Sequence, residues 1–228
     1  MKPQISFPLV AVNFKTYNES AGEASIRLAK IAESVSQKTG VCIVVAPQLV
    51  DLSSVARSVR LPTLAQHVDP YDPGAHTGHS SIEAVKYAGV AGSLINHSEH
   101  MLKLSEIDLI VRKLRRLGLT SIVCTNTAEV SAAVAALDPD VIAIEPPELI
   151  GTGIPVSKAK PEIVTDTITL IKRVNPKVRT LCGAGITKGE DAASAIKLGT
   201  IGVLVSSGVV KAEDPSRALT DLAENLKT

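Results

Sequence analysis

Eight short apolar runs recur at an even spacing along the chain, and each lacks the polar alternation of a half-exposed strand. Runs of this kind indicate strands that are buried on both faces, as in parallel sheets. The predicted strands are Pro8–Asn13, Val41–Ala46, Thr63–Gln66, Gly92–Asn96, Ser121–Thr125, Val141–Ile144, Arg179–Cys182 and Gly202–Val205. Both faces of such a sheet have to be covered, which favours the α/β class.

Segments with the apolar spacing of helices lie between the strands. They are Ser25–Val35, Glu83–Tyr87, Ile107–Leu117, Glu129–Leu137, Ile163–Val174, Asp191–Leu198 and Arg217–Leu226. Eight units in 228 residues have about 28 residues each, the size of one strand, loop and helix. No Gly/Ser-rich linker interrupts the order, so we expect a single domain over residues 1–228.

Eight such units can form a doubly wound open sheet or a closed barrel, and periodicity does not choose between them. The chemically unusual residues follow strands one, four, six, seven and eight. One site fed by all these strands forms easily in a ring, whereas strands one and six lie far apart in an open sheet. We therefore predict a closed, eight-stranded parallel (β/α)8 barrel.

Charge and cysteine usage narrow the classes of function. The 24 basic and 23 acidic side chains nearly cancel, so the chain lacks the charge of a nucleic-acid or membrane-surface protein, and a small-molecule ligand is favoured. Cys42, Cys124 and Cys182 each lie in an apolar run, which is typical of reduced, buried thiols. No signal-peptide pattern and no membrane-length apolar stretch is found, so we expect a cytoplasmic protein.

Polar residues follow strands one and four. Asn13 and Lys15 lie two residues apart after the first strand, where extended geometry would point both the same way. Lys15 could stabilise negative charge on a carbonyl oxygen, or be a solvated loop lysine. His97 follows the fourth strand, and a helical turn beginning at Ser98 would keep its imidazole neutral; alternatively His97 is a loop histidine without a special role.

Glu145 follows the all-apolar sixth strand directly. A carboxyl group surrounded by apolar residues has a raised pKa and is a stronger base than a surface glutamate. Pro146 and Pro147 stiffen the start of the next loop, while Gly151 and Gly153 would let it move and bring backbone amides against a phosphate. The alternatives are a buried glutamate in an ion pair and an ordinary turn.

Small residues follow the last two strands, as Gly183-Ala184-Gly185 and Ser206-Ser207-Gly208. In a (β/α)8 barrel the seventh and eighth loops are the usual phosphate-binding site, because small residues let backbone amides approach an anion. A zinc site is also conceivable, since His76 and His79 have a His-x-x-His spacing. They lie in a Pro- and Gly-rich loop without an obvious third ligand, so we predict no metal.

These motifs resemble those of the triosephosphate isomerase family along the whole chain, and in detail its short, archaeal-type members. The matching catalytic and lid motifs are Asn13-x-Lys15, His97-Ser98-Glu99, Ile144-Glu145-Pro146 and Ile150-Gly151-Thr152-Gly153. Ala65-Gln66 is similar to the family's third-strand segment, and Ala75-His76-Thr77-Gly78 is similar to the loop that reaches into a partner subunit.

The resemblance implies a TIM barrel that interconverts D-glyceraldehyde 3-phosphate and dihydroxyacetone phosphate through an enediolate, in glycolysis and gluconeogenesis, without a cofactor. It implies that Glu145 is the base, His97 the electrophile, Lys15 a source of charge and Asn13 a neighbouring donor. The implied phosphate contacts are backbone amides near Ile150, Gly151, Gly185, Ser206 and Ser207.

Short members of the family are tetramers, so the resemblance also implies a homotetramer, with apolar faces left by short helices. Two rival functions stay open. An epimerase of pentulose phosphates would use similar phosphate loops but needs metal ligands that the loops after strands one, two and six do not supply. A non-catalytic binding protein is the second, although Asn13, Lys15, His97 and Glu145 are all present.

Overall fold

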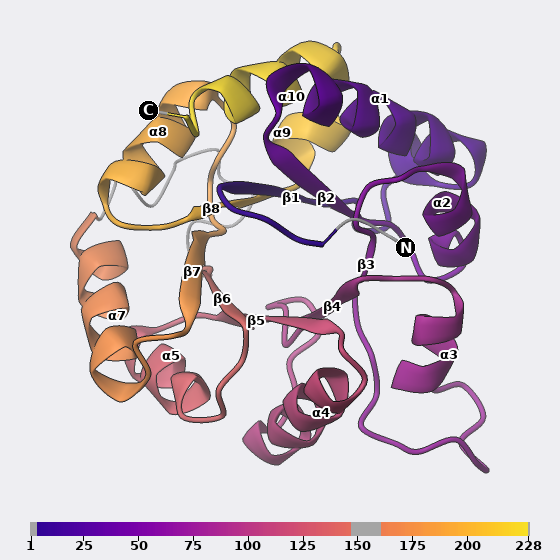
Figure 1. Cartoon of the computed structure of the whole chain (residues 1–228), viewed down its shortest axis with the longest axis vertical. Helices are drawn as coiled ribbons and strands as arrows, with labels where there is room; N and C mark the ends of the chain where they lie inside the picture. Colours follow the sequence, from indigo (N-terminus) through magenta and orange to yellow (C-terminus); the bar gives the residue numbers. More distant parts are fainter. Residues whose placement is uncertain (1–3, 147–160, 228) are drawn as a thin grey trace.

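The computed structural model describes residues 4–146 and 161–227, in which strands and helices alternate around a central ring (Figure 1). The strands are β1 (Leu9–Asn13), β2 (Cys42–Ala46), β3 (Leu64–Ala65), β4 (Gly92–Ile95), β5 (Thr120–Thr125), β6 (Val141–Ile144), β7 (Arg179–Cys182) and β8 (Gly202–Val205). The helices are η1 (Asn18–Ser20), α1 (Glu23–Thr39), α2 (Leu52–Ser58), α3 (Ile82–Tyr87), α4 (Leu104–Arg116), α5 (Ala128–Ala135), α7 (Pro161–Val174), α8 (Gly189–Lys197), α9 (Ser207–Val210) and α10 (Pro215–Glu224).

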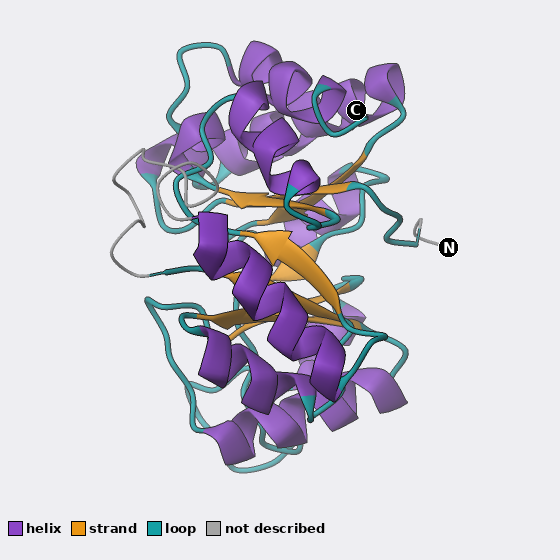
Figure 2. Ribbon diagram, turned by 90° about the vertical axis from the view of Figure 1, so that its left-hand side faces the viewer, coloured by secondary structure: helices purple, strands orange, loops and turns teal. Residues whose placement is uncertain are grey.

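The eight strands form one parallel sheet that closes on itself. Neighbouring strands follow the order β2-β1-β8-β7-β6-β5-β4-β3, so the first strand pairs with the last. The two ends of this order meet at a parallel bridge between Val45 and Thr63. The ring of strands with helices outside it (Figures 1 and 2) confirms the predicted barrel, which is the TIM-barrel fold.

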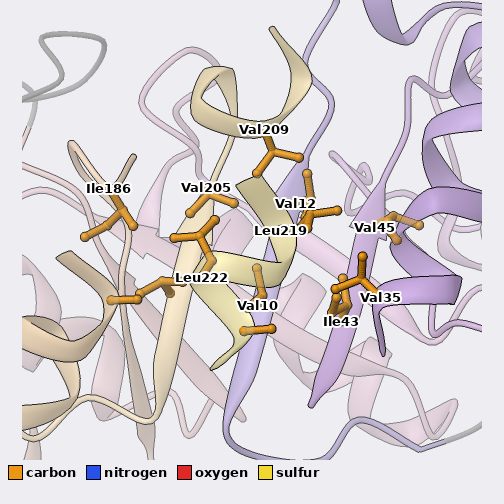
Figure 3. Close-up of a cluster of buried hydrophobic side chains, with 14 of the residues drawn as sticks. Val10, Val12, Val35, Ile43, Val45, Ile186, Val205, Val209, Leu219 and Leu222 are labelled. Atoms are coloured by element: carbon orange, nitrogen blue, oxygen red, sulfur yellow. The ribbon is translucent and has the colours of Figure 1, made fainter. Parts of the chain in front are cut away.

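Alternation along the strands separates two sets of buried side chains. In β1, Leu9 and Ala11 belong to a cluster built mainly from strand residues, which fills the barrel interior. Val10 and Val12 belong to a second cluster, in which strands pack against α1 and α10 through side chains such as Leu219 (Figure 3). Because both faces of every strand are buried, the strands are continuous apolar runs.

The predicted strands agree with the observed ones to within a residue or two, and β6, β7 and β8 agree at both ends. Thr63–Gln66 is the largest difference, since only Leu64 and Ala65 are in strand geometry. Three of the described helices were not predicted, namely η1, α2 and α9. The longest of them, α2, has Leu52, Val55 and Ala56 buried at helical spacing, a signal that its seven-residue length made weak.

Helix ends follow local capping chemistry. The carboxylate of Asp214 accepts a hydrogen bond from the Arg217 N–H at the start of α10, and Pro215 occupies the first turn. None of the described helices is long and apolar enough to cross a membrane. The three cysteines are free thiols; Cys124 and Cys182 are buried as predicted, whereas Cys42 is only half-buried.

Candidate active site

A cavity of about 60 Å³ opens at the carboxyl ends of the strands. Eight of its lining residues were singled out in the sequence, namely Asn13, Lys15, His97, Glu145, Gly183, Gly185, Ser206 and Ser207. A larger hollow of about 420 Å³ shares Asn13, Lys15 and His97 with it. Residues from strands one, four, six, seven and eight thus meet at one mouth. Ile150 and Gly151, the remaining predicted contacts, lie outside the described residues.

Asn13 and Lys15 continue the inward alternation of β1 beyond Ala11. The Lys15 N–H donates to the Asn13 side-chain oxygen at 2.9 Å, and Lys15 adopts a left-handed backbone with φ 48°. Its ammonium group lies 2.7 Å from the carboxylate of Glu99. With a side chain only 14% exposed, Lys15 is not a solvated loop lysine but a cation held over the cavity.

The loop after β4 differs from the predicted helical turn. Asn96 has a left-handed φ of 59°, and its amide donates to the Cys124 carbonyl while its side-chain oxygen accepts from the Leu102 N–H. Residues 98 and 99 then form a plain turn, closed by the His100 N–H donating to the His97 carbonyl at 2.7 Å. No helix starts at Ser98, so a helix dipole does not act on His97.

The His97 ring is nevertheless held in one neutral form. The Glu99 N–H donates to Nδ1 at 3.2 Å, so the ring proton is assigned to Nε2. Burial lowers the pKa of His97, and the nearby Lys15 ammonium lowers it further, against an opposing effect of Glu99. The imidazole therefore presents a neutral N–H donor to the cavity.

Glu145 lies opposite this donor, with its Oε1 3.5 Å from His97 Nε2. The residue is 3% exposed, and burial raises its pKa to about 7, although the Cys124 thiol and Lys15 act in the opposite direction. Its Oε2 has no hydrogen-bond partner in the part of the chain that the structure describes. A buried carboxylate with a spare oxygen and a raised pKa is well suited to accept a proton.

Gly183 makes room for this carboxylate. A Cβ atom at position 183 would lie 2.6 Å from the Glu145 Cγ, closer than carbon atoms approach. The sequence assigned Gly183-Ala184-Gly185 to phosphate binding as one unit. In the structure Gly183 packs against the base, while Gly185, with φ 71°, lines the cavity further along the loop.

Ser206 and Ser207 line the same cavity, at the point where β8 leads into α9. The short helix α9 was not predicted, because the Ser-Ser-Gly sequence reads as a turn. The Ser206 hydroxyl is buried and has no hydrogen-bond partner among the described residues. A buried orphan hydroxyl at a cavity wall is a free contact for a polar ligand.

The His76-x-x-His79 spacing does not assemble a metal site. His76 stacks on Tyr71 with ring centroids 4.7 Å apart, and His79 lies 3.0 Å from the Asp69 carboxylate. Within residues 4–146 and 161–227, no group of three or more His, Cys, Asp or Glu side chains is arranged to hold a metal ion.

Three neighbours of the site had no role assigned to them from the sequence, although Glu99 belongs to the His97-Ser98-Glu99 motif. Asn96 shapes the histidine loop, Glu99 contacts both Lys15 and His97, and Cys124 lies against Glu145. Burial and the Glu145 charge raise the pKa of the Cys124 thiol, with burial the larger cause. Asparagine tolerates left-handed backbone better than most residues, which is the one local signal that could have marked Asn96.

A carboxyl group that titrates near neutral pH and faces a neutral imidazole donor suits proton transfer at a carbon next to a carbonyl. The fold and the site therefore define a (β/α)8-barrel enzyme of the acid–base class. The sequence profile of the family "Triosephosphate isomerase" matches residues 8–226. The chain belongs to the triosephosphate isomerase family, and it is an intramolecular isomerase.

Archaeal relatives agree with this assignment. The chain is 56% identical over 215 residues to a triosephosphate isomerase of Methanothermus fervidus, covering 94% of this chain and 97% of the relative. It is 54% identical over 214 residues to that of Methanocaldococcus jannaschii, covering 94% and 98%. The enzyme of Methanobacterium bryantii is 53% identical over 219 residues, covering 96% and 97%.

Proposed function

We propose that this chain interconverts D-glyceraldehyde 3-phosphate and dihydroxyacetone phosphate, a step of glycolysis and gluconeogenesis, with Glu145 as the base. The observation that carries the proposal is the placement of the buried Glu145 carboxylate 3.5 Å from His97 Nε2, at the wall of one cavity. A substrate carbon and its neighbouring carbonyl oxygen can then meet a base and a donor together.

The proposed steps move two protons, one between neighbouring carbons and one between the oxygens that they carry. The Glu145 carboxylate removes a proton from the carbon beside the carbonyl, and the electron pair left behind forms the enediolate. The neutral His97 Nε2–H donates a hydrogen bond to the oxygen where negative charge develops, and the Lys15 ammonium stabilises the same charge. The hydroxyl proton of the enediolate also has to move to the neighbouring oxygen, and His97 Nε2 can pass it by donating its proton to one oxygen and regaining a proton from the other. Glu145 then returns its proton to the adjacent carbon, which leaves the base ionised again. Asn13, 4% exposed beside Lys15, is proposed as a further donor.

The phosphate group is proposed to bind where the loops after β7 and β8 line the cavity. Gly185, Ser206 and Ser207 line it, and the orphan Ser206 hydroxyl supports a polar ligand there. Backbone amides of Ile150 and Gly151, outside the described residues, complete the proposed set. We place the enzyme in the cytoplasm, where three thiols without a disulfide would stay reduced.

The direct test is a coupled assay in which glyceraldehyde 3-phosphate is converted and the dihydroxyacetone phosphate formed is reduced by an NADH-dependent dehydrogenase. We expect a kcat/KM on the order of 10⁶ M⁻¹s⁻¹ or higher, within the usual range for enzymes. The assay is run with and without a chelator, which should not change the rate. A purified, folded chain without isomerase activity would contradict the proposal.

We further propose that the chain associates as a homotetramer. Exposed apolar side chains gather before and along α4, where Met101, Leu104 and Leu109 are at least half exposed. The loop between β3 and α3 extends outward from the ring (Figure 1). It is anchored by the buried Lys113, whose ammonium donates to the Tyr71 carbonyl and to Asp72. A single subunit would leave these surfaces in water.

Light scattering should therefore give a mass about four times 23.9 kDa. The double variant Leu104→Glu and Leu109→Glu should lower it, because burying two carboxylates in an apolar interface is unfavourable. Val174→Glu, an equally exposed apolar residue on α7, is the matched control and should leave the mass unchanged. A parent mass equal to one subunit would rule out the tetramer.

A further inference from the structure

Lys15 has a backbone conformation that is unfavourable for a lysine residue. Its φ of 48° is left-handed, a region in which a lysine side chain crowds the backbone. Such strain persists only where the surroundings impose it. Two contacts act on the two sides of this residue, since Asn13 accepts from the Lys15 N–H and a separate donor reaches the Lys15 carbonyl.

That separate donor is the side chain of Gln66, in the residue directly after β3. Its amide nitrogen lies 3.0 Å from the Lys15 carbonyl oxygen and 2.9 Å from the Ala46 carbonyl oxygen. The Ala46 carbonyl also accepts from the Phe14 N–H at 3.0 Å. One planar amide thus links the loop after β1, the end of β2 and the end of β3.

This link crosses a seam of the barrel that has little strand pairing. Between β2 and β3 the backbone contacts are the Val45–Thr63 bridge and a 3.3 Å hydrogen bond from the Val45 N–H to the Pro62 carbonyl. The pairing of β7 with β8 is as short, whereas β1 pairs with β2 over five residue pairs. The Phe14 N–H already fixes the Lys15 loop to the end of β2, and the Gln66 side chain adds the link from this loop to the end of β3.

We propose that Gln66 is a positioning residue for the reaction, which acts by holding the left-handed Lys15 so that its ammonium points into the cavity. The inference rests on the proposed role of Lys15. Glutamine is suited to this because both amide hydrogens are donors and both acceptors here are carbonyls. A glutamate of the same shape would place carboxylate oxygens against them, and methionine would remove the donors.

The test is a double-mutant cycle. Gln66→Met and Gln66→Glu are each made in the parent and in Lys15→Ala, and kcat/KM and the thermal midpoint are measured for every variant. In the parent, each Gln66 substitution should lower kcat/KM about 10- to 100-fold, because a misplaced charge loses much of its effect. In Lys15→Ala, itself strongly impaired, the same substitutions should cost about twofold or less, since no ammonium is left to position.

The thermal midpoint separates this role from a structural one. The lost hydrogen bonds should lower the midpoint similarly in both backgrounds, while the loss of kcat/KM depends on Lys15. Gln37→Met, an exposed glutamine on α1, is the control and should match the parent.

The results separate a failure of the proposed role of Gln66 from a failure of the proposed role of Lys15. An equal loss of kcat/KM in both backgrounds, or no loss in the parent, would overturn the role of Gln66 and leave that of Lys15 intact. A Lys15→Ala variant with the kcat/KM of the parent would overturn the proposed role of Lys15, and with it the inference.

Discussion

Shortening the side chain at position 145 by one methylene, in Glu145→Asp, should lower kcat by about 10²- to 10⁴-fold. The carboxylate lies 3.5 Å from His97 Nε2 and is enclosed. The shorter aspartate side chain moves the carboxylate away from the substrate carbon, and the enclosed position leaves no room for it to move back. The measurement is steady-state kinetics in the coupled assay. Glu129→Asp, on the exposed surface of α5, is the matched control and should keep the kcat of the parent. Equal rates in the two variants would remove Glu145 from the mechanism.

The pH profile tests the same residue. Only the ionised carboxylate accepts a proton, and burial raises the pKa of Glu145 to about 7. In the free enzyme, kcat/KM should therefore rise with pH and level off above an inflection near 7. An inflection near 4.5, the ordinary value for glutamate, would show that burial does not act on this carboxyl group.

The stability of a Glu145→Gln variant shows whether a loss of activity at this position comes from unfolding. The pKa of Glu145 is about 7 in the folded chain and about 4.5 when unfolded, so between these values the folded state binds more protons. The free energy of unfolding therefore falls as pH rises from about 4.5 to about 7, because the buried carboxyl group has to ionise. Glu145→Gln should therefore be inactive yet more stable than the parent at pH 8, by an amount on the order of 2 to 3 kcal/mol. Denaturant unfolding at pH 5 and pH 8 measures this; a variant less stable than the parent at pH 8 would contradict it.

Replacing His97 by glutamine should lower kcat by about 10²- to 10³-fold, the usual cost of losing a donor aimed at developing negative charge. A glutamine amide can still donate, but the Glu99 N–H no longer holds a ring in place. His97 is neutral in the parent, so the rise of kcat/KM with pH is set by Glu145 and not by His97. The inflection near pH 7 should therefore remain in the variant.

His100→Gln is the matched control for this second prediction. His100 lies three residues away on the same turn, is exposed, and stacks on His67 with ring centroids 3.9 Å apart. Its replacement should change kcat less than about threefold, as surface substitutions usually do little. A His97→Gln variant as active as His100→Gln would mean that the imidazole donor does not act in the reaction.

The sequence predicted the parts of the fold that depend on local patterns. Buried strands in a parallel sheet have to be apolar along their whole length, so all eight were visible. The prediction for β3 was twice as long as the observed strand, because it included Thr63 and Gln66 at the two ends. Short helices such as α2 and α9 were missed, since a few residues carry little periodicity. Lys15, His97 and Glu145 each follow a strand, so closing the parallel strands into a barrel brings all three to the same mouth.

Other features depend on partners far away in the chain. His97 is neutral because of burial and Lys15, and not because of the expected helix at Ser98. The Glu99 contact with Lys15 joins residues 84 positions apart, and the Gln66 contact joins residues 51 apart. Gly183 reads in the sequence as part of a phosphate loop, yet it lies where Glu145 needs space.

The sequence by itself therefore determined the order of strands and helices, the family, and the three side chains at the mouth, because these follow from periodicity and from motifs on adjacent residues. The sequence also predicted a raised pKa for Glu145 and a neutral His97, but only the tertiary structure decided what keeps His97 neutral and which conformation Lys15 adopts. The physical reason is that a pKa depends on burial and on charges brought close in space, and that a strained backbone persists only where distant groups hold it.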